Sequence, residues 1–96
     1  MLSQQNEQYK VIIRLKAIGS APILKHQVFK LSSTNTFSRV VQFIKKELGL
    51  KEQDGLFLYC NSAFIPQPDE ILGDLDRLHG VEGQLVINYA LNPAFG

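Results

Sequence analysis

Several features that would point to a catalytic, extracellular or membrane-spanning protein are scarce in this sequence. It contains one cysteine, Cys60, and no tryptophan. A single cysteine excludes an internal disulfide framework and is typical of a reducing compartment. No apolar run approaches the roughly 20 residues of a membrane-spanning helix, and the polar start, residues 1–8, lacks the apolar core of a signal peptide. We therefore expect a soluble intracellular protein.

The charge is too balanced, and the potential ligands too few, for several classes of binding protein. Ten basic and nine acidic residues give a net charge of +1, which argues against a nucleic-acid partner held through phosphates. Two histidines and one cysteine have no metal-site spacing, and no glycine-rich loop of the phosphate-binding type occurs. We expect neither a metal nor a cofactor. The apolar share of 45% over 96 residues predicts a single globular domain.

The first half of the chain predicts a hairpin followed by a helix. In residues 10–18, apolar residues at 11, 13, 15 and 17 alternate with mainly polar ones, which is typical of a strand. A turn signal at 19–22 precedes a second alternating segment, 23–31, the predicted partner strand. Apolar residues then recur at helical spacing from Phe37 to Leu48, and Gly49 is a natural helix stop.

The second half predicts mainly strands. The run 56–60 is nearly all apolar, which favours a central strand covered on both faces. Residues 63–65 suggest a short edge strand, and 69–79 suggest one or two 3₁₀ turns. The last strand, 84–91, is apolar on both faces and is expected to pair centrally. The pattern predicts an α+β protein of the β-grasp type, with a mixed sheet of four to five strands packed on one main helix.

The sequence ends in glycine on a short tail. We expect residues 1–9 to be a flexible N-terminal segment, 10–91 the folded domain and 92–96 a C-terminal tail. Because glycine has no side chain, the Gly96 carboxylate could enter a narrow channel in a partner, and the extended tail could reach up to roughly 16 Å. Taken alone, the tail fits an inert terminus better than a protein that reacts through its own C-terminus, so the second interpretation depends on the domain that carries the tail.

Three segments carry a resemblance to a known family. They are RLKAIGSAPILK at 14–25, the pattern Asn-x-x-Phe-x-Pro-x-Pro-Asp at 61–69, and GQLVINY at 83–89 followed by Phe95-Gly96. In this order the chain, from Lys10 to Gly96, resembles the autophagy-related protein 12 family of ubiquitin-like modifiers. The family usually ends in Trp-Gly, whereas this chain ends in Phe95-Gly96. Relatives often expose a Trp where this chain has Phe29.

The resemblance implies a function in autophagy without catalytic activity of its own. An E1-like enzyme would activate Gly96, and an E2-like enzyme would pass it to a lysine of an acceptor of the autophagy-related protein 5 type. Phe95 and Ala94 would provide tail contacts. The conjugate would act in an E3-like manner in lipidation of a second ubiquitin-like protein. The implied location is the cytoplasm, with recruitment to autophagosome precursor membranes only through partners.

The resemblance also implies a partner-binding surface for the E2-like enzyme of lipidation, formed by Lys10, Phe29 and Phe64. If Leu24 and His26 face the core, strict alternation turns Phe29 outward, onto the same face as Lys10. Alternatively, Phe29 folds under the N-terminal segment or packs on the rim. The competing function is a non-covalent ubiquitin-like interaction domain that binds partners through its sheet.

Cys60 is predicted to be a small core residue rather than a nucleophile. A catalytic thiol needs a base within hydrogen-bond reach, and the two histidines, His26 and His79, lie on separate predicted elements. We expect His26 to lie in or near the core and His79 to be a turn or capping residue. The acidic residues between Asp69 and Asp76 are expected to form a solvated face.

Overall fold

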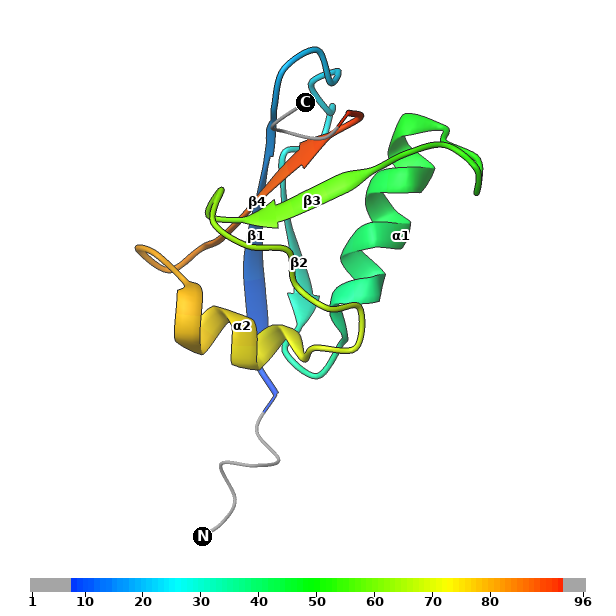
Figure 1. Cartoon of the computed structure of the whole chain (residues 1–96). Coiled ribbons are helices and arrows are strands. Elements are labelled where there is room, and N and C mark those ends of the chain that lie inside the picture. The colour runs from blue at the N-terminus through cyan, green and yellow to red at the C-terminus, as the bar shows by residue number, and fades with distance from the viewer. Residues whose placement is uncertain (1–7, 93–96) are drawn as a thin grey trace, which may run out of the picture.

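Between residues 8 and 92, four strands form one mixed sheet, and two helices complete the fold (Figure 1). The structure, a computed structural model, describes residues 8–92. The elements are β1 (Lys10–Ala17), β2 (Val28–Ser32), α1 (Phe37–Leu48), β3 (Phe57–Cys60), α2 (Leu72–His79) and β4 (Leu85–Ala90). The strand order is β2-β1-β4-β3. This arrangement confirms the predicted mixed sheet with one main helix.

The last strand is central, as its apolar sequence predicted. β4 runs parallel to β1 and antiparallel to β3, while β1 also pairs with β2 in antiparallel fashion. β3 is an edge strand, so the predicted central position was wrong. In the sheet, β3 pairs with β4 alone. Its sequence is nevertheless apolar because Leu58, Tyr59 and Cys60 are all buried. The predicted edge strand 63–65 is reduced to one bridge between Cys60 and Phe64.

The main helix follows the predicted pattern closely. Phe37, Val40 and Ile44 are fully buried on one face of α1. Gly49 ends the helix with a φ of 69°, and its N–H donates to the carbonyls of Lys45 and Lys46. A residue with a side chain is strained in this left-handed conformation, which explains the glycine.

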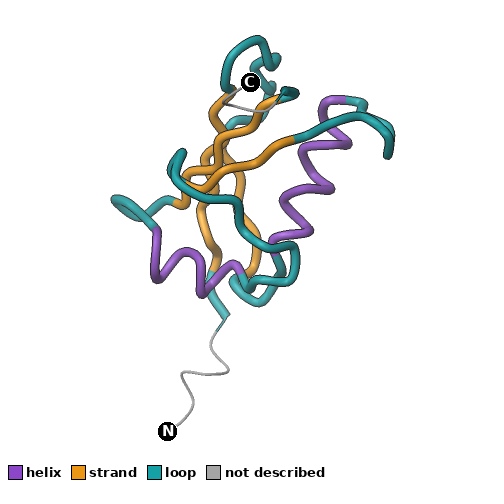
Figure 2. Tube along the Cα trace, viewed as in Figure 1, coloured by secondary structure: helices purple, strands orange, loops and turns teal. Residues whose placement is uncertain are grey.

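One face of the sheet carries the core. Its buried strand side chains come from alternate positions of β1, β4 and β3: Val11, Ile13, Leu15, Leu85, Ile87, Tyr89, Leu58 and Cys60. The buried residues of both helices belong to the same cluster, so both helices pack on this face. Figure 2 shows α1 alongside the strands and α2 at the end of the sheet where β1 begins. Neither helix of this part of the chain has the length and hydrophobicity of a membrane span.

The segment predicted as 3₁₀ turns is a regular helix, α2. It buries Leu72 and Leu75, and Gly73 lies so close to Ser33 that a Cβ there would come within 3.2 Å of the serine. The prediction was wrong because the segment contains an early glycine, which disfavours a helix, and has no side-chain cap at Ile71. Tertiary packing of the two leucines outweighs this weak local preference.

The second strand begins later than predicted. Residues 23–27 are irregular, and β2 starts at Val28. Leu24 is buried, but Ile23 is 75% exposed. His26 is also exposed, contrary to the expected core position, and its Nδ1 lies 3.5 Å from the Glu47 carboxylate. The alternation counted from Leu24 therefore does not continue into β2.

Candidate functional site: the root of the C-terminal tail and the docking surfaces

The structure shows how the segment leading to the C-terminal tail is held. β4 ends beside β1, with Tyr89 opposite Ala17, and the N–H of Ile18 donates to the Tyr89 carbonyl at 2.8 Å. Leu91 is partly buried against the core. The predicted tail residues Ala94, Phe95 and Gly96 lie outside the described residues. The root of the tail is thus part of the folded domain.

Tyr89 ties this root to the connection between β1 and β2. Its hydroxyl donates to the Pro22 carbonyl at 2.6 Å and accepts the N–H of Leu24 at 3.0 Å. Tyr89 is 1% exposed. The sequence analysis missed this role because Tyr89 stands in an apolar run. The sequence does contain one indication of this role. A tyrosine in an apolar strand is expected to be buried, and a buried hydroxyl usually forms a hydrogen bond.

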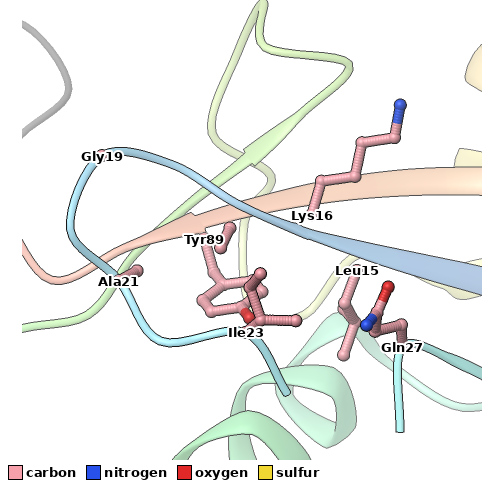
Figure 3. A pocket seen from close by; sticks show the side chains of 8 residues that line it. Leu15, Lys16, Gly19, Ala21, Ile23, Gln27 and Tyr89 are labelled. Carbon is pink, nitrogen blue, oxygen red and sulfur yellow. The ribbon is translucent and has the colours of Figure 1, made fainter. Parts of the chain in front are cut away.

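A hollow of about 360 Å³ opens next to Tyr89. Its lining residues are Leu15, Lys16, Ala17, Gly19, Ala21, Ile23, Gln27 and Tyr89. In Figure 3, the Ile23 side chain lies against the Tyr89 ring, while Lys16 points away from both. The walls are mainly apolar, and no acid, histidine or thiol lines them. The hollow is suited to taking up an apolar side chain rather than to catalysis.

Phe29 does not face outward, so the predicted orientation was wrong. Its ring stacks on Phe43 of α1, with the ring centroids 4.1 Å apart. The register pairs Phe29 with Ile13, which is fully buried on the helix-covered face. The reason is the irregular segment 23–27, which breaks the alternation on which the prediction depended. Phe29 remains partly exposed where the edge strand β2 meets α1, a surface here called the β2–α1 edge. This position is close to the alternative prediction that Phe29 packs on the rim.

The other two predicted contact residues lie elsewhere. Lys10 begins β1 opposite Ser32, is exposed, and occupies the face without helices. Phe64 follows β3, the opposite edge strand from β2, and its ring lies 4.5 Å from the His79 ring, centroid to centroid. His79 ends α2, and its carbonyl accepts from the Asn61 amide. Lys10, Phe29 and Phe64 therefore do not form one patch.

Cys60 is a core residue, as predicted. It is 0% exposed, and burial, followed by the charge of Glu70, raises the pKa of its thiol from 9.0 to about 11. A thiol of this kind is protonated at neutral pH and is a poor nucleophile. Within residues 8–92, no three His, Cys, Asp or Glu residues are placed to hold a metal ion.

The acidic segment is largely solvated. Asp74 forms an exposed ion pair with Arg77 at 2.9 Å. Asp76 accepts a hydrogen bond from the Tyr9 hydroxyl at 3.3 Å. Burial and then the charge of Asp76 raise the pKa of Tyr9. These contacts attach the chain before β1 to α2, and they do not form a walled pocket with two carboxylates poised for acid–base chemistry.

Sequence comparison identifies the family of this chain. The family described as "Ubiquitin-like autophagy protein Apg12" matches residues 10–96. The chain belongs to the Apg12 family of ubiquitin-like autophagy proteins. The ubiquitin-like protein ATG12 of Cryptococcus neoformans is 44% identical over 95 residues, which cover 99% of this chain and 90% of that protein. The ATG12 of Gibberella zeae is 48% identical over 88 residues, covering 91% of this chain and 55% of that protein.

The fold is shared more widely than the sequence. The crystal structure of ATG8 from Trypanosoma brucei matches this chain with a TM-score of 0.77 at 21% identity, covering 91% of this chain and 77% of that one. This likeness confirms the ubiquitin-like β-grasp fold. The Apg12 membership confirms a ubiquitin-like protein of autophagy, as the sequence motifs indicated.

Proposed function

We propose that this chain is a protein modifier of autophagy that is conjugated through Gly96. An E1-like enzyme adenylates the Gly96 carboxylate with ATP, releasing pyrophosphate. A cysteine of that enzyme displaces AMP to form a thioester, which passes to a cysteine of an E2-like enzyme. A lysine amine of an acceptor of the autophagy-related protein 5 type then attacks the thioester, forming the isopeptide bond and releasing the thiol. The chain supplies the acyl group, and its partners supply every nucleophile.

The anchored root of the tail is the observation that best supports this proposal. The Ile18 amide and the Tyr89 hydroxyl hold the end of β4 to the neighbouring connection. A tail leaving a rigid root can present its terminus to an enzyme while the domain docks outside. The match to the Apg12 family extends to residue 96 and so includes the terminal Phe95-Gly96 pair.

We further propose that the β2–α1 edge docks the E2-like enzyme of lipidation. Phe29 and Phe43 form a stacked aromatic pair there, and β2 pairs with only one strand of the described sheet. An aromatic anchor beside an unpaired strand edge suits an extended peptide segment. Lys10 lies on the opposite face of the sheet from Phe29, and Phe64 lies beside the opposite edge strand, so neither belongs to this contact. The domain works in the cytoplasm and reaches autophagosome precursor membranes with its partners.

Deletion of Gly96 tests the conjugation directly. The tagged parent chain, expressed in its own cells, is expected to give a denaturation-resistant band heavier by one partner protein. The deletion is expected to lose that band. Asn92→Ala, which keeps the tail length and the terminal glycine, is the matched control and should retain it. Free protein alone in every lane, with the partner still co-purifying under native conditions, would contradict conjugation and support the non-covalent interaction domain.

Phe29→Ala tests the docking edge separately. Calorimetric titration with the lipidation enzyme is expected to show at least about a tenfold loss of affinity, which is the effect of removing an interface anchor. Phe64→Ala, at the other edge, is the control and should bind like the parent. Equal affinities for parent and Phe29→Ala would contradict the assignment.

A further inference from the structure

The face of the sheet without helices carries a stripe of positive charge. Four basic residues of the strands, here called the basic stripe, point to this face: Lys10, Arg14, Lys16 and Lys30. Lys10, Arg14 and Lys16 alternate along β1 with the buried face, and Lys30 pairs with Ile12, which lies on the same face as these three. The four strands contain no aspartate or glutamate. The strands thus place four basic residues on one face, although the net charge of the chain is only +1.

No residue of the basic stripe forms an ion pair within the described range 8–92. The two ion pairs found there involve His26 with Glu47 and Arg77 with Asp74. Arg14 donates from Nε to the neutral Gln84 side chain at 2.7 Å. Lys10, Lys16 and Lys30 are exposed. Like charges gathered on one face repel one another and attract an anionic partner.

Aliphatic side chains lie between the basic residues. Val28 is 43% exposed opposite Arg14, and Ile12 and Val86 are partly exposed on the same face. From Lys10 to Lys16 the stripe extends roughly 20 Å along β1 at the usual rise per strand residue. The surface thus combines a row of cations with short apolar side chains.

We propose that the basic stripe binds directly to the surface of an anionic membrane. The main reason is that β1 already has hydrogen-bonding neighbours on both sides. A peptide lying on this face would find charge but no free backbone groups along β1. A lipid surface requires only charge and shallow apolar contact, both of which the face provides. An attraction of about fivefold per basic residue near such a surface gives weak, reversible binding.

This inference goes beyond conjugation and does not depend on it. Conjugation brings the domain to a membrane through its partners, whereas the basic stripe would orient it there by direct contact. The root of the tail and the β2–α1 edge would remain accessible, because the root lies at one end of the sheet and the aromatic edge lies on the helix-covered side. The Gly96 deletion should therefore bind vesicles like the parent.

Vesicle co-flotation of the full chain tests the proposal. The parent is expected to float with vesicles of phosphatidylcholine and phosphatidylserine, but not with phosphatidylcholine alone, and added salt should weaken binding. Lys16→Glu with Lys30→Glu should lower the partition coefficient at least about tenfold. The control pair Lys46→Glu with Lys51→Glu, exposed residues outside the strands, makes the same change in net charge and should retain most binding.

A milder double variant, Lys16→Gln with Lys30→Gln, guards against misfolding and should show an intermediate loss while keeping the circular dichroism of the parent. Equal losses for the stripe and control pairs would contradict a specific face. So would binding to a soluble polyglutamate peptide together with no flotation, because that result would make the face an acidic-peptide site.

Discussion

The two faces of the sheet alternate along the same strands, yet their chemistry is opposite. In β4, Ile87 is 0% exposed beneath the helices, while its neighbour Val86 lies on the basic face and remains partly exposed. In β1, Ile13 is fully buried, while Arg14 reaches a surface glutamine. One face thus holds the fold together, whereas the β1–β2 part of the other is free to interact; on its β4–β3 part, Asn88 and Tyr59 are buried. Stability and binding should therefore respond to different, adjacent residues.

The largest loss of stability should come from shortening a buried side chain on the helix-covered face. Ile87→Ala is expected to lower the free energy of unfolding by about 2–5 kcal/mol, because it removes buried methylene and methyl groups and leaves a cavity. Val86→Ala, one residue away, should cost less than about 1 kcal/mol because its side chain is only partly buried. Urea unfolding of both variants measures the contrast. Similar losses for the two would mean that both faces contribute to the core.

This contrast between faces was only partly predictable from the sequence. Period-two alternation over 10–18 and helical spacing from Phe37 to Leu48 correctly assigned the buried positions, because burial on one side imposes those periods. The same logic failed at Phe29, where an irregular segment shifts the phase of alternation by one residue, which inverts the faces. It also missed the hydrogen bonds of Tyr89, since a tertiary contact with Leu24 across 65 positions leaves no local pattern.

An intermediate effect should come from titrating the one thiol of the helix-covered face. The pKa of Cys60 is raised from 9.0 to about 11 in the folded protein, so the folded state retains its proton where the unfolded chain has lost it. The thiol's contribution to stability is therefore complete below pH 9 and is lost as the pH rises through 11. The unfolding free energy of the parent, relative to Cys60→Ala, should fall by at most about 3 kcal/mol across this window.

Taking the difference between parent and Cys60→Ala removes the titration of lysines and tyrosines common to both proteins. Chemical unfolding at a series of pH values from 8 to 11 gives the comparison. A difference that does not change with pH would show that the thiol is not shielded in the way its burial requires. The same thiol should react with a disulfide reagent only as fast as the domain opens.

The smallest loss of stability is expected where the helix-covered face meets the root of the tail. Tyr89→Phe keeps the buried ring but leaves the buried N–H of Leu24 without its acceptor. The free energy of unfolding is expected to fall by about 1–2 kcal/mol, with faster hydrogen exchange at the Leu24 amide.

Tyr9→Phe is the matched control, since the Tyr9 hydroxyl makes longer and more exposed contacts with Asp76 and Gly73. This variant should lower the free energy of unfolding by less than about 0.5 kcal/mol. If Tyr89→Phe also reduces conjugation while Tyr9→Phe does not, the rigid root serves transfer of the tail as well as stability. If both variants conjugate like the parent, the root serves stability alone.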